Sequence, residues 1–124
     1  MFDLTAEEAR LLLKIAMMAT GRNRFRSAAR ILAALERFRP DQVSVATAKA
    51  VALMSAQKFS EAVDFIDAEG LVRFPDSAML KAFKGMALVR MDRPEDARRP
   101  LEEAASQSGD PAAAKMAGDL LGDL

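Results

Sequence analysis

Pairs of neighbouring acidic residues are the first candidates for chemistry in this chain. Two carboxylates can divide acid and base roles when they face one site, but neighbours on a helix point about 100° apart. Some of these residues also fall in the first turn of an expected helix, where acidic side chains stabilise the helix dipole. We therefore interpret the pairs as structural: Glu7-Glu8, Glu95-Asp96 and Glu102-Glu103.

The chain contains neither histidine nor cysteine. This removes the commonest general base and the commonest metal ligand, and it excludes disulfides and thiolate metal sites. The stretch ATGRNR at 19–24 has a single glycine and resembles a helix-to-helix turn more than a phosphate-binding loop. We expect no enzyme, no metal and no cofactor.

Length and charge restrict the class of protein further. The chain has 124 residues, with 18 basic and 18 acidic side chains, which favours a single domain over 1–124 and argues against a nucleic-acid partner. Its first residues, MFDLTAEEAR, lack the pattern of a signal peptide, and no segment has the apolar length of a membrane span. We expect a cytoplasmic protein without membrane insertion.

An internal repeat of 34 or 35 residues organises the chain. Small residues recur at two positions of each unit, and each unit closes with a Pro-Asp or Asp-Pro step. A period of 34 residues is the length of a tetratricopeptide repeat. The recurring small residues are Ala16, Ala50 and Gly85, and then Ala28, Ala62 and Ala97.

The repeat predicts an all-α fold of stacked helical hairpins. Small side chains let the two helices of a hairpin approach closely, and a hairpin buries its apolar face only against another copy. Phe25 and Phe59 would plug the turns, whereas Pro94 takes that place in the third unit. We expect a tetratricopeptide-like solenoid with repeats at about 9–41, 43–76 and 78–110 and a capping helix at 111–123.

Local signals place the helix ends. Thr5 with Glu8 and Asp92 with Glu95 match the capping box. Gly70 is expected to end the fourth helix, and Pro100 to kink the sixth helix or delay its start. The helices are expected at 5–20, 24–38, 42–56, 59–69, 76 or 77 to 91, 92–106 and 110–123.

The first helix of each hairpin is expected to line a concave face. Four rows of residues at equivalent repeat positions point there, and the face is mostly apolar and rich in methionine, which suits an adaptable binding surface. The alternative is that these methionines are core. The rows are Met17, Val51 and Met86; Thr20, Met54 and Val89; Leu13, Thr47 and Ala82; Arg10, Ser44 and Met79.

A run of arginines occupies 22–39. One interpretation is a solvated helix face whose long stems cover apolar surface. The other is an electropositive rim, formed by Arg22, Arg26 and Arg30, for an acidic partner segment. The sequence leaves both open.

Two stretches are similar to the small tetratricopeptide-like chaperones of type III secretion, above all those that hold the needle subunit. The first is LLLKIAMMATGRNRFRSAARILAAL at 11–35, with Ile15, Ala16, Thr20 and Gly21 at the helix end. The second is ASQSGDPAAAKMAGDLL at 105–121, with its Ser-Gln and Asp-Pro elements. The large aromatic residue that tetratricopeptide repeats place early in the first helix is replaced by Leu12, Ala46 and Lys81.

The resemblance implies a cytoplasmic chaperone whose concave face covers the amphipathic helix of a needle subunit, commonly with a small helical co-chaperone. The alternative is a repeat-type scaffold that assembles through its basic run. An exposed apolar groove would also favour a homodimer without cargo. The resemblance assigns the groove to Leu13, Met17, Val51, Met54, Met79, Met86 and Val89.

Overall fold

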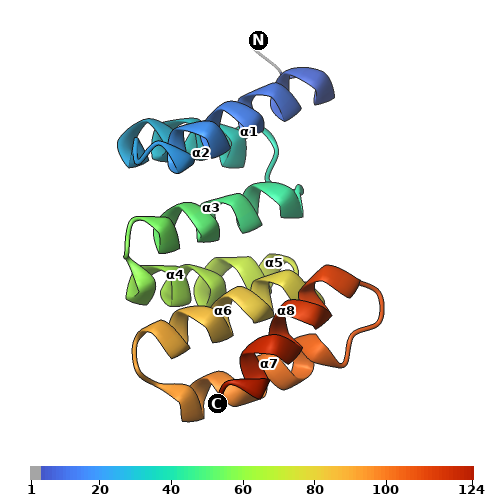
Figure 1. Ribbon diagram of the computed structural model, residues 1–124. Helices are drawn as coiled ribbons and strands as arrows, with labels where there is room; N and C mark the ends of the chain where they lie inside the picture. The colour runs from blue at the N-terminus through green and yellow to red at the C-terminus, as the bar shows by residue number, and fades with distance from the viewer. Residues whose placement is uncertain (1–3) are drawn as a thin grey trace. The chain divides into compact units, whose positions relative to one another are not determined.

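The computed structural model describes residues 4–124, and every regular element in that part of the chain is helical (Figure 1). This confirms the all-α class. The chain divides into two compact units, Met1–Gln57 and Lys58–Leu124; the single domain stays a prediction. The elements are α1 (Ala6–Gly21), α2 (Phe25–Phe38), α3 (Val43–Ser55), α4 (Phe59–Phe65), η1 (Ile66–Gly70), α5 (Leu71–Arg73), α6 (Ala78–Arg90), α7 (Pro94–Ala105) and α8 (Pro111–Gly122).

Side-chain caps begin three of the helices where the sequence places them. At α1, the Thr5 amide donates to Glu8 Oε1 and the Glu8 amide donates to Thr5 Oγ1, both at 3.1 Å. Hydrogen bonding of the Glu8 carboxyl with the Thr5 backbone, and with the Thr5 side chain, holds the pKa of this exposed carboxyl below its usual value. At the start of α6, Ser77 Oγ accepts from the Leu80 amide, and at the start of α8, Asp110 Oδ1 accepts from the Ala113 amide. The capping box at Thr5 is therefore confirmed.

The predicted capping box at Asp92 is wrong. Asp92 has a φ of 58°, in the left-handed region, and α7 begins two residues later with Pro94 in its first turn. Proline suits that place because its missing N–H would have no helical partner. Arg93 is the N-cap, and its side chain pairs with Asp96 (2.9 Å). Pro100 lies inside α7 and does not delay its start.

The fourth predicted helix does not end at Gly70. The chain continues through the π-helical turn η1 into α5, and Gly70 keeps right-handed helical angles. A Cβ at this position would lie 3.2 Å from Leu80 Cδ1, so the glycine permits close approach of α6. The π turn also takes up the extra residue that makes one repeat spacing 35 instead of 34.

A left-handed residue stands at the same repeat position in each of the three hairpin turns. Asn23, Gln57 and Asp92 have φ values of 61°, 64° and 58°. Such a conformation is costly for residues other than glycine, with asparagine and aspartate the most tolerant. Sequence reasoning missed the position, because Gln57 carries no turn signal of its own.

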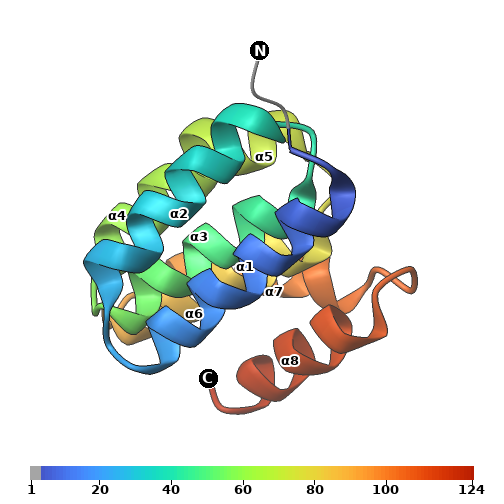
Figure 2. The ribbon, with the colours of Figure 1, turned by 90° about the horizontal axis from the view of Figure 1, so that it is seen from above.

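The first unit packs α1, α2 and α3 together (Figure 2). Its core contains Ala16 of α1, Leu32 and Leu35 of α2, and Val45, Ala48 and Ala52 of α3. Leu12, Leu13 and Met17 pack against this core from α1. Outside the core, Lys49 Nζ of α3 pairs with Glu36 Oε1 of α2 at 3.0 Å. Small residues of α1 and α3 thus let two helices converge on the leucines of α2.

The second unit is built around α6, which contacts α4, η1, α7 and α8. Gly85 of α6 faces Leu101 of α7, and a Cβ at Gly85 would overlap the Leu101 side chain. Leu101, Leu80 and Ile66 are among the largest fully buried side chains. Lys84 Nζ of α6 pairs with Asp67 Oδ1 of η1 at 2.7 Å. Gly85 therefore sets how closely α6 and α7 can pack.

Replacing Gly85 with alanine is expected to lower the free energy of unfolding by about 1–3 kcal/mol, because the new methyl group overpacks against Leu101. Gly118→Ala in α8 is the matched control, since nothing lies within 4 Å of the position that its Cβ would take; that change should raise stability by about 0.5–1 kcal/mol. Urea denaturation measures both. Equal effects of the two changes would contradict the assigned contact.

Gln57→Gly should raise the free energy of unfolding by about 0.5 kcal/mol, because relief of left-handed strain exceeds the entropy that glycine adds to the unfolded chain. Ala29→Gly, at an exposed position inside α2, should lower it by about 1 kcal/mol. Thermal unfolding followed by circular dichroism compares the two. A loss at both positions would contradict the left-handed geometry at Gln57.

Candidate functional site

The groove positions predicted in the first unit lie on α1 and α3. Leu13 and Met17 of α1 are half-buried and pack against the unit's core. Val51 of α3 is half-buried, whereas Met54 is only 9% exposed. Both interpretations, groove and core, therefore hold in part: Leu13, Met17 and Met54 contribute to the core, and all but Met54 keep part of their surface in solvent.

The groove positions predicted in the second unit all lie on α6. Met79, Met86 and Val89 are half-buried. The last helix, α8, packs against both α6 and α7. Its Met116 and Leu120 are half-buried as well. The second unit thus presents partly exposed apolar side chains on α6 with a further helix alongside.

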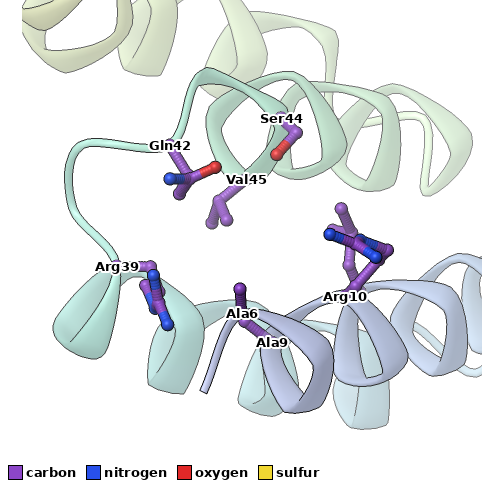
Figure 3. Close-up of a pocket in the computed structure, with 8 residues that line it drawn as sticks. Ala6, Ala9, Arg10, Arg39, Gln42, Ser44 and Val45 are labelled. Carbon is purple, nitrogen blue, oxygen red and sulfur yellow. The ribbon is translucent and has the colours of Figure 1, made fainter. Parts of the chain in front are cut away.

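A cleft of about 120 Å³ lies in the first unit, between the N-terminal parts of α1 and α3 (Figure 3). Leu13 joins it from the predicted groove, and two residues from another concave row, Arg10 and Ser44, line it too. The volume suits one side chain rather than a whole helix. The lining residues are Ala6, Ala9, Arg10, Leu13, Arg39, Gln42, Ser44 and Val45.

Arg39 is fixed at the edge of this cleft. Its Nη2 donates to the carbonyl oxygen of Leu4 at 2.6 Å, and the side chain is half-buried. Arg10 stands on the opposite wall (Figure 3). Two guanidinium groups beside apolar surface favour an acidic or amide side chain as the occupant. Sequence reasoning missed Arg39 and Gln42, because the connection between α2 and α3 has no periodicity to place them.

The three arginines of the predicted basic rim are exposed. Arg22 follows α1, while Arg26 and Arg30 lie on α2. Within residues 4–124, none of the three takes part in an ion pair. By contrast, Lys49, Lys81 and Lys84 each form an ion pair with an acidic residue of another helix. The lysines therefore link helices through ion pairs, whereas the charges of the rim arginines are exposed to solvent.

Comparison of the chain with protein-family models, curated proteins and solved structures found no match. Across residues 4–124, no helix has both the length and the apolar character required to cross a bilayer. The candidate site is therefore described from the positions and burial of its own residues.

Arg39→Ala is expected to lower the free energy of unfolding by about 1–2 kcal/mol, because it removes a charged donor to the Leu4 carbonyl. Arg37→Ala, close by in the last turn of α2 and exposed, should change it by no more than about 0.5 kcal/mol. Urea denaturation of both variants tests the bond. Equal losses would show that Arg39 is not held as described.

Proposed function

We propose that this chain is a tetratricopeptide-like chaperone that holds an amphipathic helix, and that its cargo is a type III secretion needle subunit kept from assembling before export. The proposal combines the resemblance of 11–35 and 105–121 to such chaperones with the chemistry of the helix faces. Cytoplasmic action, and the participation of a small co-chaperone, belong to the same proposal.

One observation carries the proposal. Large apolar side chains at one equivalent repeat position of α1, α3 and α6, namely Met17, Val51 and Met86, are half-buried, while the small residue just before each of them is buried. In tetratricopeptide stacking, these equivalent positions line one concave face. Apolar surface that is contiguous over several helices is typical of a face that binds a partner. Leu13, Met79 and Val89, at other positions of the predicted groove, are half-buried as well.

The chemistry of these positions favours a helix over a charged peptide end. Repeat proteins that bind a terminal carboxylate place lysine, arginine and asparagine on the concave face, whereas this chain places methionine, leucine and valine there. Methionine is unbranched and polarizable, so it adapts to an irregular apolar surface. The cleft beside Arg10 and Arg39 would then receive a polar side chain at the edge of the bound helix.

Met86→Glu is expected to weaken cargo binding at least tenfold, because the cargo's apolar face would have to desolvate a carboxylate. Helix content should not change, since Met86 is only half-buried. Val72→Glu is the control, because Val72 is 70% exposed and lies on α5, which carries none of the proposed cargo positions. Binding of a peptide with the needle subunit's C-terminal helix is measured by fluorescence anisotropy; undiminished binding by Met86→Glu would reject the assigned face.

The exposed rim arginines support a second candidate function, a scaffold that docks on an acidic partner. Double reversal, Arg26→Glu with Arg30→Glu, should abolish such docking, and added salt should weaken it. Capture from a lysate of the source bacterium, followed by mass spectrometry, separates the two functions. A large assembly lost with the arginine reversals would favour the scaffold, and a short helical protein lost with Met86→Glu the chaperone.

A further inference from the structure

Helix α1 has a second apolar face, which points away from the core. Leu11, Ile15 and Met18 are exposed by 59%, 42% and 58%. Their spacing of four and three residues puts them on one side of the helix, within about 60° of one another. The core-facing residues of α1, such as Ala16, lie on another side. We call Leu11, Ile15 and Met18 the α1 stripe.

The equivalent repeat positions of α3, also in the first unit, show how this side of a helix packs when another helix covers it. On α3 they are Val45, Lys49 and Ala52. Val45 and Ala52 belong to the core that contains the leucines of α2, and Lys49 pairs with Glu36 of α2. This side of α3 therefore packs on the helix that precedes it.

The second unit repeats the arrangement on α6, at Leu80, Lys84 and Ala87. Leu80 packs over Gly70 of η1, Lys84 pairs with Asp67 of η1, and Ala87 is fully buried. No helix of residues 4–124 precedes α1. On the α1 stripe, Ile15 stands at the repeat position of these paired lysines, so an apolar side chain takes the place of a charged one.

Charges at the two ends of the stripe indicate what covers it. Glu8 and Arg22 lie seven residues before and seven after Ile15, both exposed and both on the same side of α1. If a second α1 lies antiparallel on the first, Glu8 of each copy meets Arg22 of the other. A parallel pair would instead bring like charges together. Isologous, two-fold contacts are the commonest form of self-association.

We propose that the α1 stripe is a self-association surface, on which a second copy of this chain seats its own α1 in antiparallel orientation. Ile15 meets Ile15 of the second copy at the two-fold axis, Leu11 meets Met18, and Glu8 pairs with Arg22. A helix of 16 residues is about 24 Å long, so the contact is small and the dimer depends on concentration. The surface is separate from the proposed cargo positions, and the inference stands without the proposed function.

Cysteine cross-linking tests the geometry directly, because the chain has no cysteine of its own. Ile15→Cys should form a disulfide-linked dimer of twice the 13.5 kDa chain mass under mild oxidation. Leu11→Cys alone should not, because the two sulfurs would lie about 12 Å apart along the helices, beyond disulfide reach. A mixture of Leu11→Cys and Met18→Cys should yield the mixed dimer.

The pattern of cross-links decides the orientation. Efficient cross-linking of Leu11→Cys by itself would mean a parallel pair and would overturn the proposal. Absence of cross-linking at Ile15→Cys would overturn it as well. Val72→Cys, exposed on α5, reports random collision and should give only background dimer.

Sedimentation equilibrium of the full chain tests the energetics. Ile15→Glu should weaken dimerisation more than tenfold, because two carboxylates would meet at the axis. Arg22→Glu should weaken it about tenfold, and adding Glu8→Gln should restore part of the loss, since glutamine relieves the repulsion and keeps the capping box. Val72→Glu should leave the association unchanged.

Two results of the sedimentation experiment would overturn the proposal. The first is a wild-type chain that stays monomeric at the highest soluble concentration. The second is a dimer that survives Ile15→Glu, which would place the association on another face. If a different protein covers the stripe, the wild-type chain is monomeric alone and Ile15→Glu abolishes capture of that protein, which also rejects the second copy as occupant.

Discussion

The close approach of α6 to α7 at Gly85 is the constraint on which the second unit depends. Leu101 fills the space where a Cβ would stand, and it is itself completely buried. A larger residue at Gly85 would push α7 outward, and with it α8, which packs on both helices. The first unit meets the same demand with Ala16, which is fully buried in its core.

Cores built on small residues have a consequence for the surface. Helix α3 buries Ala46, Ala48, Ala50 and Ala52, so its larger apolar side chains cannot all be interior. Val51 and Leu53 are only half-buried. The same partition on α1 and α6 places methionines at the periphery. A fold that packs backbones closely thus displaces its adaptable side chains to faces where another molecule can reach them.

Helix starts were predictable from sequence where the signal is local. Thr5, Ser77 and Asp110 each cap an amide three residues ahead, so a short window contains all the information. The helix end predicted at Gly70 is wrong because glycine can either end a helix or permit close approach of another helix. Only the contact with Leu80, which is distant in sequence, distinguishes these two roles. Arg39 and Gln42 join the cleft through the path of a connection that no periodicity describes. The repeat predicts which helix faces pack against each other. It contains no information about the molecule that binds the exposed faces.

The π turn at η1 changes the spacing of the repeat along the chain. An extra residue usually lengthens a loop, where it leaves the helices on either side unaltered. Here it widens one helical turn, and the hairpin connections keep their geometry, as the left-handed residues at Asn23, Gln57 and Asp92 show. A template of strict 34-residue spacing consequently falls one residue out of step after Gly70, and Gly85 and Ala97 both arrive one place late. The extra residue therefore changes the spacing of the repeat, while the left-handed residue keeps its place in the turn that follows.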